Sequence, residues 1–397
     1  MYKYIVFILF SFLCNLNIFA QSNKVVAGPM MSFVDSYGTQ IWFLLNSDTE
    51  RINIDVSDYD SDKVLKYAFE VVNPFNLEEF PYTVLLDDLR PDKEYIVSIY
   101  VDSVLVKEID LFTETSHLDD LQFLIGHDLT GTDESILTYM SETNSDFMMW
   151  LGGHVDLESE MTFEDMLVEY INVRKKEKLN NFLVSMPQIA TWSILDYGFS
   201  NPPNSLEEKE LIYSVFDLFW PNTIHKTYNY TFDDYGTYQR YTYNDVDIFL
   251  LDAQTFKSDH SLYGDKQIER LFQEIGNTGA SFTILASPAP FISSSEKSFS
   301  NYQDEFQHFM EKLKTHNKNG LFLISIGSEN EPRLFHHRLD EKSSFIYEFT
   351  LPVFGSNNYS MISLKGPKKN RIMSFETYNK NGNLLYRRNF DQNQLTN

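Results

Sequence analysis

The chain has 397 residues, of which 43% are hydrophobic and 15% aromatic, enough apolar material for about two or three packed domains. Its formal net charge of −25 excludes a nucleic-acid-binding protein, because binding nucleic acid needs a basic footprint. The same charge repels polyanionic substrates and acidic membrane headgroups at long range.

The first twenty residues have the pattern of a secretory signal peptide. Lys3 gives a basic start, residues 5–13 form a nearly unbroken apolar run, and Ala20 is a small residue before the polar Gln21. The run is too short to span a bilayer. The sequence therefore predicts cleavage after Ala20, a secreted or periplasmic protein and no transmembrane segment. A buried N-terminal helix is the alternative.

Cys14 is the only cysteine in the chain. It is a poor lipoprotein anchor, because Phe12 and Leu13 are too large for the small residues expected before a lipidated cysteine. Cleavage after Ala20 leaves a mature chain without a thiol. We therefore expect no disulfide, no cysteine nucleophile and no thiolate metal ligand.

Residues 24–116 predict a small β-sandwich domain. Short strands such as 52–56 and 95–101 alternate apolar and polar residues, with polar turns and no helical period. In segment 86–95 two leucines precede a proline and a tyrosine, and this spacing resembles the tyrosine corner of fibronectin type III-like domains. We expect this domain to support or orient its neighbour rather than to do chemistry.

Residues 117–397 predict a layered α/β domain, because uniformly apolar strands alternate with helical stretches. In such folds the functional groups lie on loops at the carboxyl ends of the strands. The expected strands are 121–125, 147–151, 246–251, 282–286 and 321–326. The expected helices are 134–143, 163–180, 206–219, 265–275 and 303–316.

Four motifs follow one another along this second domain. They are residues 146–152, residues 187–192 with 196–198 behind them, residues 218–222 and residues 245–252. In this order and spacing they resemble the signatures of PhoD-like alkaline phosphatases, a branch of the calcineurin-like metallophosphoesterases. Residues 28–42 and 371–386 resemble the start of that family's β-sandwich and its closing hairpin. The resemblance covers nearly the whole mature chain and implies a metallophosphoesterase fold.

The positions at which that family binds metal have changed. Its Gly-Ser-Cys corresponds to residues 126–128, Gly-His-Asp, and its bridging Asp corresponds to Gly153. Its Asp-Asp-His run is replaced by residues 193–195, Ser-Ile-Leu, and its late Gly-Asp-x-His by residues 327–330, Gly-Ser-Glu-Asn. The family would use iron and calcium, or another divalent-metal pair. In this chain we expect no metal or other cofactor.

Two metals in such a site clamp the attacking and leaving oxygens and generate hydroxide at neutral pH. Without the bridging carboxylate this mechanism has no support, so we expect a degenerate cleft. Its residues are His127, Asp128, Gly153, His154, Asp156, Ser193, Asp196, Ser328, Glu329 and Asn330. No catalytic residue is assigned.

A rearranged single-metal site is the alternative, because histidines and carboxylates are metal-ligand types. Its candidates are His127, Asp128, His154, Asp156 and Asp196. Two functions therefore stay open. One is a secreted pseudo-phosphatase that binds an unknown protein or glycan partner or has a role in assembly. The other is a metal-dependent phosphomonoesterase or phosphodiesterase.

Overall fold

The structure is a computed structural model, and twelve segments of the chain are described. They are 24–113, 120–129, 134–159, 161–198, 206–222, 236–243, 245–293, 295–316, 320–339, 345–352, 358–368 and 370–395. The predicted signal peptide and the predicted domain boundary at residue 116 lie outside these segments and stay predictions. Among the segments no helix is both long enough and apolar enough to cross a membrane.

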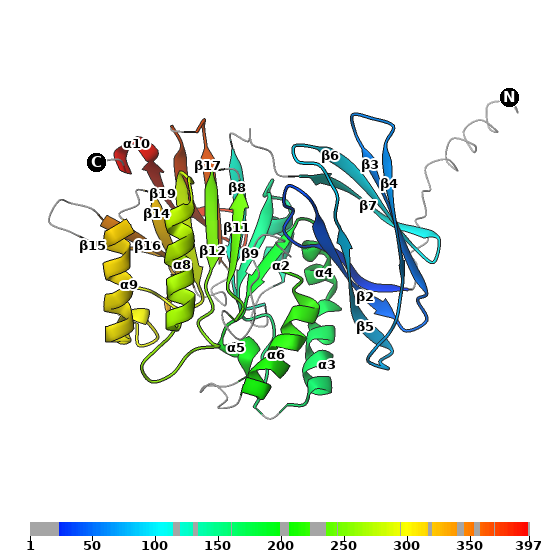
Figure 1. Ribbon diagram of the computed structural model, residues 1–397, viewed down its shortest axis with the longest axis horizontal. Coiled ribbons are helices and arrows are strands. Elements are labelled where there is room, and N and C mark those ends of the chain that lie inside the picture. Colours follow the sequence, from blue (N-terminus) through cyan, green and yellow to red (C-terminus); the bar gives the residue numbers. More distant parts are fainter. Residues whose placement is uncertain are drawn as a thin grey trace, which may run out of the picture.

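Residues 24–113 form the predicted β-sandwich, with seven strands and no helix in this gap-free segment. The three-stranded inner sheet has the order β1-β2-β5, and the four-stranded outer sheet has the order β4-β3-β6-β7 (Figure 1). The strands are β1 Val25–Met31, β2 Thr39–Asn46, β3 Arg51–Asp58, β4 Val64–Glu70, β5 Glu79–Leu86, β6 Glu94–Val101 and β7 Val104–Phe112.

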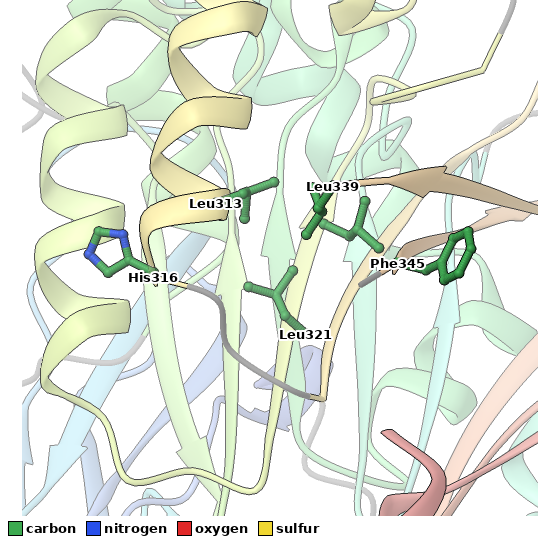
Figure 2. A pocket seen from close by; sticks show the side chains of 6 residues that line it. Leu313, His316, Leu321, Leu339 and Phe345 are labelled. Carbon is green, nitrogen blue, oxygen red and sulfur yellow. The ribbon is translucent and has the colours of Figure 1, made fainter. Parts of the chain in front are cut away.

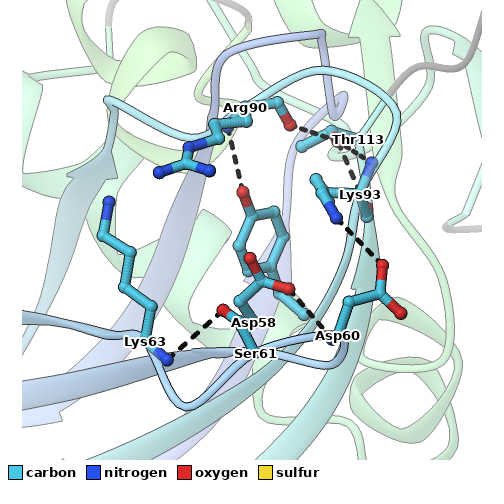
Figure 3. Close-up of polar contacts among 8 residues, drawn as sticks. Asp58, Asp60, Ser61, Lys63, Arg90, Lys93 and Thr113 are labelled. Atoms are coloured by element: carbon cyan, nitrogen blue, oxygen red, sulfur yellow. Dashed lines mark hydrogen bonds and ion pairs between the residues drawn. The ribbon is translucent and has the colours of Figure 1, made fainter.

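The predicted tyrosine corner is present at the start of β6. Tyr95 is buried, and its hydroxyl accepts a hydrogen bond of 3.0 Å from the Arg90 backbone N–H. The Thr113 hydroxyl donates to the Arg90 carbonyl at 2.7 Å and accepts from the Lys93 N–H at 3.0 Å (Figure 3). The loop before β6 is thus fastened both to the core and to the end of β7.

The α/β domain contains two six-stranded sheets that face each other across a shared apolar core (Figure 1). One has the order β10-β9-β8-β17-β18-β19, the other β11-β12-β13-β14-β16-β15. The first comprises β8 Leu121–Gly126, β9 Phe147–Leu151, β10 Gln188–Thr191, β17 Asn358–Lys365, β18 Ile372–Asn379 and β19 Leu384–Asp391. The second comprises β11 Gln239–Tyr243, β12 Val246–Leu250, β13 Phe282–Ser287, β14 Leu321–Ile326, β15 Arg333–Arg338 and β16 Phe345–Leu351.

Helices cover the outer face of each sheet, as expected for apolar strands buried on both sides. One group packs on the first sheet and the other on the second. The first group is α2 Ser135–Ser141, α3 Phe163–Arg174, α4 Glu177–Leu183, α5 Ile194–Tyr197 and α6 Leu206–Phe219. The second group is α8 Asp265–Asn277 and α9 Gln303–His316, with the single turn η1 Phe299–Asn301 before α9, while α10 Gln392–Leu395 follows β19.

The single helix predicted over residues 163–180 is wrong, because the chain forms two helices there. Lys175 ends α3, and Lys176 adopts an extended conformation before α4 begins. The break lets α4 bury three apolar side chains of its own and lets Asn180 accept a hydrogen bond of 2.8 Å from the Gly28 N–H. Packing against the β-sandwich therefore decides the helix boundary, and no Gly or Pro marks it in the sequence.

The two domains share a core in which Arg174 is buried. Its guanidinium lies 5.0 Å from the Trp42 ring centre and 4.1 Å from that of Trp220. It also donates to the Phe219 carbonyl at 2.7 Å, at the carboxyl end of α6. The Trp42 indole N–H donates to the neighbouring Leu218 carbonyl at 2.8 Å. The inner sheet is thereby docked onto α3 and α6.

Candidate functional site

The loops after β8 and β9 are closed onto each other. The Asp128 N–H donates to the Gly152 carbonyl at 2.8 Å, and the Leu129 N–H donates to the Gly153 carbonyl at 2.6 Å. Gly152 and Gly153 have φ values of 89° and 76°, a conformation that glycine adopts without steric strain. Backbone groups, rather than outward-pointing side chains, therefore fill the region directly beyond these two strand ends.

Gly153 has no room for any side chain. A Cβ atom there would lie 2.5 Å from the Asp128 Cα and 2.6 Å from the Asp128 backbone N. Gly152 is equally confined, since its Cβ would lie 2.3 Å from the Ser193 N. These neighbours are backbone atoms that cannot rotate away. A carboxylate at position 153 is incompatible with this packing of the loops.

Asp196 fastens the same loop from the opposite side. Its carboxylate is fully buried and accepts from the N–H groups of Gly153 at 2.6 Å, His154 at 2.6 Å and Val155 at 3.3 Å. It also closes a capping box at α5, accepting from the Ser193 N–H at 2.8 Å. Both oxygens are thus engaged by backbone donors. The carboxylate holds the loop in place and is not directed at a cation.

The two histidines of the candidate site point into the protein. His154 is 1% exposed, its Nε2 lies 3.1 Å from the Thr191 carbonyl oxygen, and its ring centre lies 4.3 Å from that of Trp220. Burial lowers the pKa of His154 below its usual value. The His127 Nε2 lies 3.3 Å from the Pro352 carbonyl oxygen, and burial lowers the pKa of His127 to about 4. Both rings are therefore neutral at neutral pH.

Four further candidates lie at the surface, whereas Asp128 is half-buried. Asp156 is exposed, as are Ser328, Glu329 and Asn330 in the loop after β14. Glu329 forms an ion pair with Arg333, four residues further along the chain at the start of β15. That loop reaches the others indirectly, because the Gly327 N–H donates to the Leu351 carbonyl at 2.8 Å and the next residue, Pro352, contacts His127.

The structure therefore brings three of the four predicted loops into direct contact, those after β8, β9 and β10. The fourth is linked to them through the end of β16, with its side chains turned outward.

The residues present do not fit a metal. Within the described segments no three His, Cys, Asp or Glu side chains are grouped so that they could hold an ion. Four of the five candidates for a rearranged site differ in orientation: Asp196 faces backbone N–H groups, Asp156 faces solvent, and both imidazoles face carbonyl oxygens. A dinuclear centre also needs the bridging carboxylate that position 153 cannot hold.

Asp252, the last residue of the motif at 245–252, is a second buried carboxylate of this kind. It accepts from the Trp192 indole N–H at 2.9 Å and from the N–H groups of Thr237 at 2.7 Å, Gln254 at 2.7 Å and Thr255 at 2.9 Å. The available signal was an Asp directly after an apolar strand with Thr three residues later, which favours a side-chain-capped turn.

Asn222 gives the motif at 218–222 a structural role as well. Its amide donates to the Ala190 carbonyl at 3.1 Å, and its side-chain oxygen accepts from the Tyr241 hydroxyl at 3.2 Å. It joins the edge strand β10 of one sheet to β11 of the other. The motifs that carry the resemblance are thus used to hold the layers of the domain together.

A pocket elsewhere in the domain is too small for a ligand. It has a volume of about 20 Å³, close to the space of a single water molecule (Figure 2). It lies beside the carboxyl end of α9. The lining residues are Leu313, His316, Leu321, Leu339, Phe345 and Ile346.

Comparison with known proteins identifies the fold. No protein-family profile matches the sequence, and no curated protein matches it. Among solved structures, PhoD is 14% identical and superposes with a TM-score of 0.74 over 93% of this chain and 92% of PhoD. Vps29 from Chaetomium thermophilum, at 7% identity over 68% of this chain and 99% of its own, has a TM-score of only 0.29 and supports no argument. The chain has a PhoD-like fold.

Proposed function

We propose that this protein is a secreted PhoD-like phosphatase homologue that has lost dinuclear metal binding and phosphoester hydrolysis, and that it acts by binding or assembly. The observation that carries the proposal is the closed contact at Gly153, where a Cβ atom would lie 2.5 Å from the Asp128 Cα. The space that a bridging carboxylate at position 153 would need is filled by the backbone of Asp128, in the loop after β8.

The surrounding interactions support the same conclusion. Asp196 accepts hydrogen bonds from the N–H groups of the loop after β9. Ile194 and Leu195 form the first turn of α5, where the related phosphatases have charged or imidazole groups. Because every ligand position has changed, restoring one carboxylate leaves the others missing. Nucleophile activation and electrophilic stabilisation are lost together.

The test uses the chain from Gln21 to Asn397, purified without added metal. Bound iron, calcium, zinc and manganese are measured, and hydrolysis of an aryl phosphate and an aryl phosphodiester is assayed with each metal added. We expect no stoichiometric pair of metals and no hydrolysis above background. The Gly153→Asp variant should recover neither.

The alternative, an active phosphoesterase with a rebuilt metal site, makes the opposite prediction. Stoichiometric metal, together with turnover that is abolished in His127→Ala or Asp128→Ala, would establish it. Secretion is tested separately, by determining the N-terminal residue of the protein recovered outside the cytoplasm. We expect that residue to be Gln21.

A further inference from the structure

The outer sheet of the β-sandwich presents an unusual pair of exposed aromatic rings. Tyr59 is 69% exposed and Phe112 is 59% exposed. Tyr37, before β2, is 64% exposed, whereas Tyr139 and Phe345, in the α/β domain, are 39% and 41% exposed. Single exposed apolar residues need no explanation, whereas two exposed rings on neighbouring strands offer a surface on which a ligand can pack.

Tyr59 and Phe112 lie in the same lateral row of this sheet, with Glu94 between them. Glu94 pairs with Phe112 across β6 and β7, and the Tyr59 N–H donates to the Glu94 carbonyl at 3.0 Å, which continues the β3–β6 ladder by one residue. Directly paired residues project from the same face of a sheet. We call Tyr59, Glu94 and Phe112 the aromatic row.

The aromatic row faces away from both cores. The residues next to it along the three strands, Asp58, Tyr95 and Leu111, are buried on the other side of the sheet. Because side chains alternate along a strand, Glu94 and Phe112 lie on the outer face, and the exposed Tyr59 follows directly after the end of β3. The inner sheet is the one docked on the helices, and in Figure 1 the outer sheet lies farther from those helices than β2 and β5 do.

The row is also held in a fixed shape. Asp60, in the loop after Tyr59, forms an ion pair of 2.9 Å with Lys93, the residue before Glu94 (Figure 3). Lys93 and Thr113 are joined by the bonds of the tyrosine corner. Two strand spacings, about 9–10 Å, separate the backbones of Tyr59 and Phe112, a span comparable with a disaccharide. A preformed platform loses little entropy when it binds.

We propose that the aromatic row binds a neutral polysaccharide, whose sugar rings pack their C–H faces on Tyr59 and Phe112 while their hydroxyls hydrogen-bond to Glu94. Aromatic faces carry negative electrostatic potential and attract the polarised C–H groups of a sugar. Sugar hydroxyls need acceptors, and a carboxylate offers them. The proposal concerns a separate surface and does not depend on whether the α/β domain hydrolyses phosphoesters.

Two other partners fit less well. The centre of a protein–protein interface is depleted of charged residues. Glu94 lies at the centre of this row, and Asp110 lies in the neighbouring row on the same face of the sheet. An acidic polysaccharide would be repelled by a chain with a net charge of −25. A neutral polysaccharide can pack on both rings and hydrogen-bond to the Glu94 carboxylate without electrostatic repulsion.

The test measures binding of the chain from Gln21 to Asn397 to a panel of neutral polysaccharides (glucans, xylan, mannan and galactan), with chitosan and polygalacturonate for comparison. We expect at least one neutral polymer to bind, with an affinity that changes less than about twofold between 0.1 and 1 M NaCl, because no ion pair forms. Tyr59→Ala and Phe112→Ala should each weaken binding about tenfold, and the double variant should abolish it.

Tyr139→Ala is the matched control, since it removes an exposed tyrosine from the α/β domain and should leave binding unchanged. The exposed positions of Tyr59 and Phe112 let both variants fold, which their thermal unfolding checks. Absence of binding to every neutral polymer overturns the proposal. So does binding to chitosan or polygalacturonate alone, or binding that the double variant retains.

Discussion

Two regions of this molecule use their carboxylates in opposite ways. Asp196, in α5, is buried, and its oxygens accept hydrogen bonds from three successive backbone N–H groups of the loop after β9. On the outer sheet of the sandwich, Glu94 is exposed between two aromatic rings. The first carboxylate is committed to the fold, and the second is free to meet a ligand. The protein thus turns the reactive-looking residues of one domain inward and presents the proposed binding surface on the other.

The largest effect is expected from removing the inward carboxylate. Asp196→Ala leaves buried N–H groups without acceptors, so it should lower the free energy of unfolding by about 3–5 kcal/mol. Glu94→Ala, its outward counterpart, should change stability by less than about 0.5 kcal/mol. Urea unfolding of both variants measures the difference. If the two substitutions lower the free energy of unfolding equally, the buried and the exposed carboxylate do not differ in their contribution to the fold.

A side chain at position 153 should have the next largest effect. Gly153→Ala places a Cβ against the Asp128 backbone at a φ of 76°, so we expect a loss of about 2–4 kcal/mol. Gly279→Ala is the control, because a Cβ there meets nothing within 4 Å. If Gly153→Ala is as stable as the control, the two loops can separate and the space for a metal is not closed.

The sequence predicted the layers well because their signals are local. The uniform apolar runs gave β8, β9 and β14 to within one residue, and the spacing before Tyr95 predicted a real tyrosine corner. The helix break at Lys176 was missed, because it depends on contacts with the distant Gly28.

The candidate site was predicted only in part, for a physical reason. An Asp that caps a loop and an Asp that holds a metal look alike in sequence, so the role of Asp196 required its hydrogen-bond partners. For Gly153 the sequence showed that a carboxylate was missing. Only the structure shows that the backbone of Asp128 fills the space. Roles set by distant packing cannot be derived from residue type alone.

Acid should weaken the inward region specifically. His127 has its pKa lowered to about 4, against 6.5 in the unfolded chain, because burial disfavours the imidazolium. Between these values the unfolded chain binds a proton that the folded protein does not. Stability is therefore lost as the pH falls from about 6.5 to about 4, by about 2–3 kcal/mol from this group.

His127→Gln provides the comparison, since glutamine can still donate to the Pro352 carbonyl and does not titrate. Unfolding free energies at pH 7.5 and pH 4.5 should differ by about 2–3 kcal/mol less in the variant than in the wild type. Parallel pH profiles would show that His127 is not buried in its neutral form.

The smallest effect is expected in the loop after β14, which lies between the two extremes. Its polar side chains are exposed like Glu94, yet Glu329 already pairs with Arg333 at about half exposure of each. Exposed ion pairs contribute little, so Glu329→Ala combined with Ser328→Ala should change the unfolding free energy by less than about 0.5 kcal/mol. A larger loss would mean that this loop, like the one after β9, is part of the scaffold. Unchanged stability with an altered metal content would mean that the exposed side chains of this loop contact a ligand. The loop after β14 would then belong with the outward-facing region rather than with the scaffold.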